Sequence, residues 1–409
     1  MSTEHSPIQK NKRQLESVMR LKIKPDLVCF SHLRWDFVHQ RPQHLLTRAV
    51  ADRRVFFVEE PVFDNGTMHL EMNEREGGIQ LVVPHLPSGL HSEVAGNAVL
   101  KDLVQRLFVS NGIQDYICWY YTPMALMFTS QLNPRAIVYD CMDELSAFKG
   151  APANLKMLEN ELFRRADLVF TGGQSLFESK RERHRSVHCF PSSIDRDHFK
   201  RARELTPDPE DQKEIPHPRL GFFGVVDERL DIELLKRAAN ARPDWHFVVI
   251  GPVVKIDPTS LPDNPNIHYL GPKSYQSLPA YISGWDLALL PFALNESTRF
   301  ISPTKTPEYL AAGKRVVSTP IADVVQPWGD LNLVAIANGA DEFVAVVEEL
   351  LQKQPDDDEN WIERVDAFLS GMSWDLNWSR MSKLIDDVLE KGVSGKAVKI
   401  LNQKATSTA

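Results

Sequence analysis

Cysteine is sparse in this chain of 409 residues, which contains only Cys29, Cys118, Cys141 and Cys189. The four lie far apart and form no C-x-x-C pair, so their spacing predicts neither a zinc knuckle nor a dithiol redox motif. The simplest interpretation is free thiols in a reducing compartment. The sequence also lacks any run of about 20 apolar residues, the length needed to span a bilayer.

An excess of positive charge is lacking as well. There are 47 lysine and arginine residues against 55 aspartate and glutamate residues, which gives a formal net charge of −8. Proteins that bind nucleic acid usually present a basic face, so no nucleic-acid partner is expected. Residues 1–24 are polar and basic without the apolar core of a secretory signal, and we expect a cytoplasmic protein. This basic tail could contact anionic lipid at the inner membrane face, although a solvated tail is the simpler interpretation.

The overall composition is that of a folded protein. Hydrophobic residues make up 43% and charged residues 25% of the chain, values typical of globular domains. This excludes a chain disordered throughout, collagen-like repetition and a disulfide-stapled miniprotein. The length predicts two domains or three.

Short apolar runs alternate with amphipathic segments along most of the chain. Continuous apolar runs separated by helices are typical of parallel strands covered on both faces, which predicts the doubly wound α/β class. Strands are expected at 26–30, 54–58, 80–83, 116–120, 136–139, 168–171, 187–190, 219–223, 246–250, 267–270, 287–290 and 315–318. Helices are expected from 42 and at 98–109, 153–165, 175–183, 231–240, 277–283, 304–312, 340–353 and 374–390.

A segment rich in proline and charge at 206–218 divides this pattern. It can sustain neither a helix nor a central strand, so it is interpreted as a linker. We therefore predict a flexible tail at 1–22, Rossmann-like domains at 23–205 and 219–373, a helix at 374–390 and a tail at 391–409. In doubly wound sheets, ligands bind beyond the carboxyl ends of the strands, so a cleft between the domains is the expected site.

The segment from Pro291 to Gly313 carries the clearest functional signal. A strand ends at Pro291, and a polar loop leads into a helix that glycine stops at position 313. Proline is tolerated in the first turn of a helix and is costly deeper inside it. Pro307 therefore favours Thr304 over Ser302 as the residue that caps this helix.

Lys305 and Glu308 then lie three residues apart on one helix face. Lys305 is at the positive end of the helix, where free N–H groups and the dipole attract phosphate. Glu308 lies one turn deeper and can accept hydrogen bonds from a diol. The pair suits a nucleoside diphosphate, with the lysine on phosphate and the carboxylate on ribose. A surface salt bridge explains the same spacing, and the spacing alone favours that simpler reading.

The run Ser302-Pro-Thr-Lys-Thr-Pro-Glu-Tyr-Leu-Ala-Ala-Gly-Lys-Arg-Val-Val317 resembles the donor-binding signature of GT-B glycosyltransferases, particularly retaining family 4, also called group 1. In addition, 220–229 resembles the strand and phosphate loop that open their C-terminal domain, and 285–291 resembles a later strand. The resemblance spans about 26–390 and is most specific in the second half. It implies an acceptor-side domain, then a nucleotide-sugar-binding domain across a cleft, and a C-terminal helix that packs back on the first domain.

The resemblance implies transfer of a sugar from a nucleoside-diphosphate sugar to a saccharide or lipid-linked acceptor, in surface polysaccharide or glycoconjugate biosynthesis. Such enzymes retain the anomeric configuration and need neither metal nor cofactor. Negative charge develops on the departing diphosphate, and preorganised cations stabilise it. The candidate catalytic residues are Arg229, Lys305 and Arg299. The candidate donor-binding residues are Gly224, Lys273, Asn295, Glu296, Thr304 and Glu308.

Two positions depart from the family pattern. Phe300 stands eight residues before Glu308, where the family commonly has another glutamate, and only Arg229 matches the cations of the phosphate loop. We therefore expect a retained nucleotide site with a remodelled sugar end. A catalytically altered sugar-nucleotide-binding protein is one alternative, and a nucleotide-sugar epimerase or hydrolase on the same fold is another.

The loop at 31–42 follows the first strand and combines histidine, tryptophan, arginine and aspartate. Aromatic rings stack on sugars and charged groups bind hydroxyls, so His32, Trp35 and Arg41 are acceptor candidates. Asp143, and Asp140 before it, follow another strand and could border the same acceptor. A packing role for this loop is supported equally well.

Two acidic runs bear on metal binding. Asp195-Arg-Asp197 matches the Asp-x-Asp motif of metal-dependent glycosyltransferases, but it follows a strand where the family has a Val-Asp turn. The run 356–359 (Asp-Asp-Asp-Glu) is interpreted as a solvated turn. Neither run predicts a metal site, and we expect no metal requirement.

Overall fold

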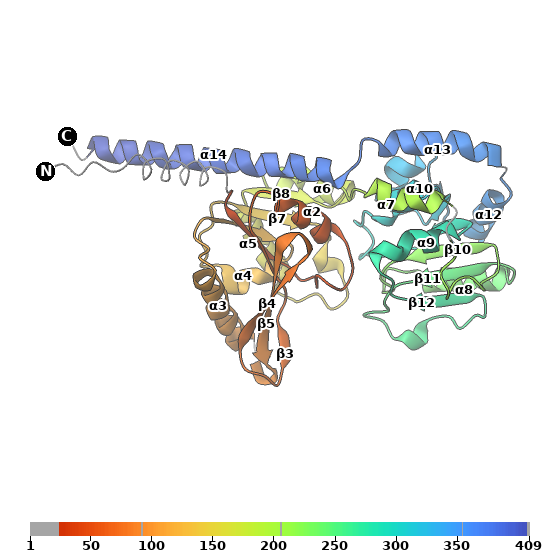
Figure 1. Ribbon diagram of the computed structural model, residues 1–409, viewed down its shortest axis with the longest axis horizontal. Coiled ribbons are helices and arrows are strands. Elements are labelled where there is room, and N and C mark those ends of the chain that lie inside the picture. Colours follow the sequence, from red (N-terminus) through yellow and green to blue (C-terminus); the bar gives the residue numbers. More distant parts are fainter. Residues whose placement is uncertain (1–23, 91–92, 205–206, 354, 407–409) are drawn as a thin grey trace, which may run out of the picture. The chain divides into compact units, whose positions relative to one another are not determined.

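The computed structural model describes residues 24–90, 93–204, 207–353 and 355–406, and Figure 1 shows the order of its elements. The chain divides into two compact units. Unit 1 contains the residues up to 140, 158–168 and those from 380 onward, and unit 2 contains 141–157 and 169–379. The tail predicted at 1–22 lies outside the described residues.

The first sheet is nine-stranded, in the order β3-β5-β2-β1-β6-β7-β8-β9, with β4 paired to β5. Its strands are β1 (Asp26–Phe30), β2 (Val55–Val58), β3 (Val62–Asp64), β4 (His69–Arg75), β5 (Ile79–Pro87), β6 (Tyr116–Tyr120), β7 (Ile137–Cys141), β8 (Leu168–Thr171) and β9 (Val187–Cys189). The strands β1, β2, β5 and β6 pair parallel, whereas β4 runs antiparallel to β5. The chain passes from β1 to β2 on one side and later to β6 on the other. The strand order therefore reverses between β1 and β6.

The helices before the second sheet are α2 (Arg41–Ala49), α3 (Glu93–Ser110), α4 (Leu126–Thr129), α5 (Leu155–Arg165), α6 (Gln174–Lys180) and α7 (Arg196–Lys200). Every residue of β1, β2 and β6 is buried, as expected for central strands with apolar side chains on both faces. Helix α7 belongs to unit 2 although it precedes the predicted linker, because its Phe199 packs on Phe223 and Tyr275.

The second sheet has six strands in the order β12-β11-β10-β13-β14-β15. They are β10 (Arg219–Phe223), β11 (His246–Ile250), β12 (Ile267–Gly271), β13 (Leu287–Leu290), β14 (Val316–Ser318) and β15 (Ala335–Ile336), and neighbouring strands run parallel. Here the strand order reverses between β10 and β13. The predicted doubly wound α/β class is confirmed for both sheets.

The helices of the second half are α8 (Ile232–Ala241), α9 (Leu278–Ser283), α10 (Lys305–Ala311), α11 (Ala322–Val324), α12 (Ala340–Leu351), α13 (Pro355–Leu369) and α14 (Trp374–Thr406). The solvated turn predicted at 356–359 is wrong, because these residues open α13. Proline at the first position and acidic residues in the first turn both favour a helix start. No described helix is long and apolar enough to cross a membrane.

The C-terminal helix is longer than expected. A tail was predicted from 391, but α14 continues to Thr406 (Figure 1). Extending an existing helix adds one hydrogen bond for each residue that is ordered, so Gly392 and Gly395 do not end it. Within unit 1, Lys24 pairs with Asp52 at 2.9 Å and with Asp386 of α14 at 2.7 Å.

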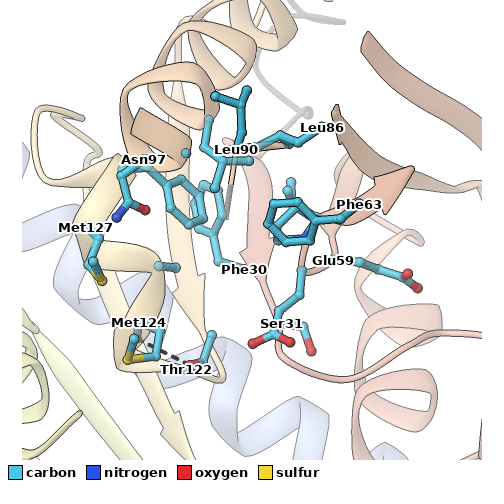
Figure 2. A pocket seen from close by; sticks show the side chains of 17 residues that line it. Phe30, Ser31, Glu59, Phe63, Leu86, Leu90, Asn97, Thr122, Met124 and Met127 are labelled. Carbon is cyan, nitrogen blue, oxygen red and sulfur yellow. Dashed lines mark hydrogen bonds between the residues drawn. The ribbon is translucent and has the colours of Figure 1, made fainter. Parts of the chain in front are cut away.

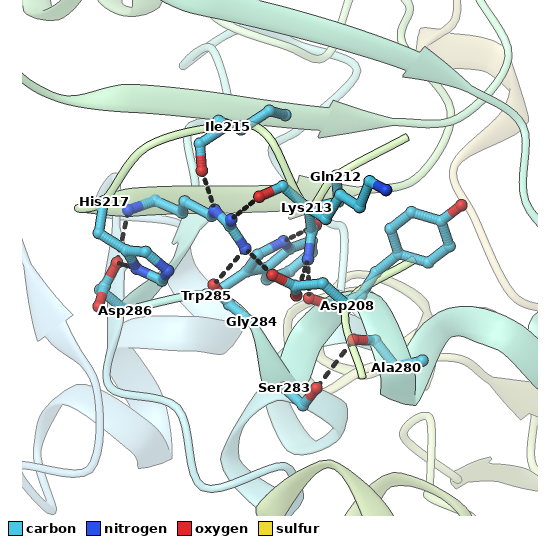
Figure 3. Close-up of polar contacts among 12 residues, drawn as sticks. Asp208, Gln212, Lys213, Ile215, His217, Ala280, Ser283, Gly284, Trp285 and Asp286 are labelled. Atoms are coloured by element: carbon cyan, nitrogen blue, oxygen red, sulfur yellow. Dashed lines mark hydrogen bonds and ion pairs between the residues drawn. The ribbon is translucent and has the colours of Figure 1, made fainter. Parts of the chain in front are cut away.

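The segment predicted to be a linker is firmly attached to the second sheet (Figure 3). Arg219, at the start of β10, pairs with Asp208 at 2.7 Å and donates a hydrogen bond to the Ile215 carbonyl at 2.6 Å. The indole N–H of Trp285 donates to the Gln212 side chain at 3.0 Å. These contacts bury Gln212 completely, so the residues from 207 onward form part of this unit.

Candidate functional site

Lys305 lies directly against the backbone at the end of β10. Gly224 follows that strand with a φ of +147°, and a Cβ atom placed on it would come within 2.3 Å of the Lys305 Cε. A larger residue would displace the lysine, so glycine is required here for both its conformation and its size. The ammonium of Lys305 lies 5.7 Å from the centre of the Phe223 ring, within the range of a cation–π contact.

Helix α10 is fixed to β10 through Tyr309. The Tyr309 hydroxyl accepts a hydrogen bond from the Phe223 backbone N–H at 2.9 Å, and its ring is fully buried. Thr304 is the residue that precedes the helix, as predicted, but its side chain makes no capping hydrogen bond. Because α10 has seven residues, the position of Lys305 depends mainly on these packing contacts and less on a long helix dipole.

Lys305 and Glu308 do not form the surface salt bridge that the spacing allowed. Among the described residues no ion pair joins them, and Glu308 is only 6% exposed. The Glu308 Oε2 atom is buried without a hydrogen-bond partner. Buried polar atoms are usually satisfied, so an unpaired carboxylate oxygen near a lysine marks a candidate ligand site.

The two groups also have shifted ionisation. Burial raises the pKa of Glu308 to about 8, although the Lys305 charge opposes this shift. Burial lowers the pKa of Lys305, against the opposing effect of Glu308. Near neutral pH, Glu308 is therefore largely protonated and provides no carboxylate charge to neutralise Lys305.

This ionisation predicts how stability depends on pH. The pKa of Glu308 rises from its ordinary value of 4.5 to about 8 on folding, so the folded state holds a proton that the unfolded chain releases between these values. The contribution of this bound proton to the stability of the folded state is present in full below the ordinary pKa of 4.5. It is lost as the pH rises through the folded-state pKa of about 8. Glutamine does not titrate, so the variant Glu308→Gln lacks this source of pH dependence. As the pH rises from about 5.5 to about 8.5, its free energy of unfolding, measured by urea denaturation, should fall less than that of the wild type. Equal slopes for the two proteins would contradict this ionisation.

Arg229 lies in the loop after Gly224 and is held by a neighbouring carboxylate. Its guanidinium contacts Asp227 through two bonds, at 2.9 Å and 2.7 Å. Burial lowers the pKa of Arg229, but the hydrogen bonds and charge of Asp227 outweigh it and raise the value. The side chain is 25% exposed. Asp227 was not predicted from the sequence, and it fixes the orientation of the cation that was.

Comparison with known proteins agrees with this geometry. Residues 217–353, which contain all the groups just described, match the family model for "Glycosyl transferases group 1". This part of the chain is therefore similar to a group 1 glycosyltransferase domain. The finer assignment to family 4 stays a prediction.

Sequence relatives and solved structures extend the likeness beyond this domain. The "Putative teichuronic acid biosynthesis glycosyltransferase TuaH" of Bacillus subtilis is 26% identical over 248 residues, which are 56% of this chain and 62% of TuaH. The matched region thus spans less than two thirds of that relative. Sucrose-phosphate synthase from Thermosynechococcus elongatus superposes with a TM-score of 0.68 at 13% identity, over 90% of this chain and 100% of its own.

A further solved structure, described as trehalose-6-phosphate from E. coli bound with UDP-2-fluoro glucose, gives a TM-score of 0.65 at 13% identity, over 89% of this chain and 99% of its own. At such identities the likeness shows the fold alone. It confirms the predicted GT-B class, with two Rossmann-like domains.

Other donor-side candidates within residues 217–353 are engaged in local structure. Lys273 pairs with Asp211 at 2.5 Å. The Asn295 side chain accepts hydrogen bonds from the following turn and donates to the Glu228 carbonyl at 3.1 Å. Arg299 and Glu296 face each other across 3.8 Å with exposed fractions of 64% and 79%. Direct contacts and electrostatic coupling therefore bring Gly224, Arg229, Lys305 and Glu308 into the candidate site. The candidates Lys273, Asn295, Glu296 and Arg299 have local partners instead.

Two of the acceptor candidates in unit 1 are structural, which corrects the prediction. Trp35 is 9% exposed and packs edge-on against Phe57 with ring centres 4.9 Å apart. Arg41 is 1% exposed and pairs with Asp140, which is fully buried, at 2.8 Å. The buried Asp140 carboxylate binds the guanidinium that was expected to face an acceptor. His32 and Asp143 are half-buried and stay candidates.

Proposed function

We propose that this protein is a glycosyltransferase that moves a sugar from a nucleoside-diphosphate sugar to an acceptor hydroxyl in surface polysaccharide or glycoconjugate biosynthesis. One observation carries the proposal: Lys305 lies over Gly224 at the switch point of the second sheet, with no hydrogen bond or ion pair from any described residue. Ligands of doubly wound folds bind at this position. The cytoplasmic location and a contact with the inner membrane face are parts of the same proposal.

The proposed chemistry follows from charge development. When the bond between the sugar and the diphosphate breaks, the electron pair goes to the leaving phosphate oxygen while the acceptor oxygen bonds to the sugar. Lys305 and Arg229 would stabilise the charge on the diphosphate, and both are already oriented before substrate arrives. The released phosphate would take the acceptor proton. Retention of configuration and independence of metal and cofactor are proposed from the family resemblance.

Gly224 and Glu308 would bind the rest of the nucleotide. The missing side chain at Gly224 lets phosphate oxygens approach the backbone. Glu308 lies one helical turn beyond Lys305, and its unpaired oxygen can accept a hydrogen bond from a ribose hydroxyl. The UDP-sugar in the E. coli neighbour makes a uridine nucleotide the first donor to test.

Phe300 favours a second candidate function. Its ring lies 5.1 Å from the Arg299 guanidinium, in the position where the family commonly has a glutamate. A protein that lacks this acid could bind a sugar nucleotide without transferring the sugar. Donor binding and donor turnover must therefore be measured separately.

The first test is a thermal-shift screen of the full chain with UDP, GDP, ADP and dTDP sugars. One nucleotide should stabilise the fold by about 2.7 kcal/mol at a hundred times its Kd. A radiolabelled form of that donor, incubated with membrane extract, should transfer its sugar and release nucleoside diphosphate, with or without EDTA. Binding without transfer or release supports the second candidate, and release of free sugar without transfer supports a hydrolase. Loss of transfer in EDTA would contradict metal independence, and no shift with any nucleotide would contradict both candidates.

A further inference from the structure

A pocket of about 280 Å³ opens in unit 1 at the carboxyl ends of the first sheet (Figure 2). Phe30 and Ser31 at the end of β1 line it, together with Glu59 after β2 and Thr122 after β6. The pocket therefore lies at the switch point between β1 and β6. Ligands of open α/β sheets bind at such a point, and none of the residues predicted to contact the acceptor lines this pocket.

The walls of the pocket are apolar. Phenylalanine, leucine and methionine side chains supply much of the lining, and Figure 2 shows several of them around a common space. Its principal wall residues are Phe30, Phe63, Leu86, Leu100, Met124 and Phe128. Methionine side chains adapt to flexible ligands, and the volume is close to the lower end, about 300 Å³, of typical small-molecule sites. An enclosed polar sugar would lose its hydrogen bonds to water here, whereas an alkyl chain would lose none.

Two polar groups at the edge of the pocket, on Glu59 and Ser31, are already paired. Glu59 accepts hydrogen bonds from the Trp35 backbone N–H at 2.6 Å and from Arg34 at 2.8 Å. Ser31 accepts from the Leu33 N–H at 2.9 Å. The described residues that line the pocket include no lysine or arginine. The lack of a cation disfavours a ligand that places a carboxylate or phosphate at the edge of the pocket. It suits a ligand whose polar group there is uncharged.

Phe63 leaves apolar surface uncovered at this pocket. It lies on β3 and is 39% exposed, unlike the buried Leu86 on the neighbouring strand β5 and the buried Phe30 on β1. Exposed apolar surface beside a hollow is typical of a ligand-binding site. A chain that enters the pocket would cover this ring.

We propose that the pocket binds the alkyl chain of an amphiphilic acceptor whose head group is uncharged and carries hydroxyls. That this ligand is the sugar acceptor rests on the proposed function, whereas chain binding itself does not. The head group would remain at the edge of the sheet, where strand ends and loops present polar groups, and the chain would fill the apolar space.

Titration calorimetry on the full chain with octyl, decyl and dodecyl glucoside, each below its critical micelle concentration, tests chain binding without a donor. Affinity should rise about fourfold for each added methylene, the equivalent of about 0.8 kcal/mol, until the pocket is full. Decyl phosphate should bind more weakly than decyl glucoside. Affinity that does not depend on chain length, or glucose that binds as tightly as its alkyl glycosides, would overturn the proposal.

Two variants locate the binding. Met124→Trp should weaken decyl glucoside binding about tenfold or more, because the indole is large enough to occupy the space. Met157→Trp is the matched control, since this methionine is 63% exposed and does not line the pocket; its affinity should match the wild type. Phe63→Ala removes a partly exposed wall residue and should weaken binding about fivefold without unfolding the protein. Unchanged affinity in both pocket variants would refute this location.

The outcomes separate this inference from the proposed function. If alkyl glucosides bind as described but no sugar nucleotide does, chain binding is supported and the transferase proposal fails. If a nucleotide binds and sugar is transferred while alkyl glucosides do not bind, the pocket proposal alone fails.

Discussion

Replacing Lys305 with methionine should lower kcat/KM for sugar transfer by about 10²–10³-fold, the usual cost of removing one preorganised group that stabilises developing charge. Methionine keeps most of the side-chain volume over Gly224 and removes only the ammonium. Because burial already disfavours the charged form of Lys305 and lowers its pKa, its loss should leave the Tm unchanged or raise it. Steady-state kinetics and thermal denaturation of the same preparation measure both effects.

Lys314→Met is the matched control. Lys314 follows the same helix, and burial likewise lowers its pKa. Its ammonium, however, donates hydrogen bonds to the Ser283 and Trp285 carbonyls at 3.0 Å and 2.6 Å. This variant should lose about 1–3 kcal/mol of stability and keep its nucleotide affinity. If Lys305→Met were destabilised as much as the control and still bound nucleotide normally, Lys305 would be structural.

The fold could be predicted wherever a strand is buried on both faces, because such strands need continuous apolar runs. The five residues of β1 and the five of β10 have the predicted bounds for this reason. Strand β4 carries polar, mostly exposed side chains, and it depends on antiparallel pairing with β5, which a local pattern does not reveal. The helix α13 was missed because its acidic first turn has the composition of a loop.

The candidate site could be predicted only where its residues are close in sequence. The spacing of Lys305 and Glu308 predicted that they share a helix face, but not that Glu308 would be buried with no ion pair between the two. That result depends on Gly224, which lies about 80 positions earlier and admits the lysine stem. The pocket in unit 1 was not predicted at all, because separate strand ends and two helices contribute its walls. Its one local signal is the paired methionines at 124 and 127.

Removing the carboxylate of Asp140 should cost about 3–5 kcal/mol of stability, because it leaves the buried Arg41 charge without its partner. Arg41 and Asp140 are 1% and 0% exposed, and the guanidinium contacts both carboxylate oxygens, at 2.8 Å and 2.9 Å. The pair lies 99 positions apart in the sequence, which is why Arg41 was predicted to be available for an acceptor.

The double variant Arg41→Met/Asp140→Leu decides between packing and acceptor binding. Burial raises the pKa of Asp140 even against the charge of Arg41, so attraction between the two does not fully offset the cost of removing them from water. Replacing both with apolar side chains of similar size should therefore restore most of the stability lost in Asp140→Ala, as measured by the midpoint of urea denaturation. The refolded double variant should keep the wild-type KM for the acceptor, because neither side chain reaches solvent. A stable double variant with a raised KM for the acceptor would instead show that Arg41 contributes to acceptor binding.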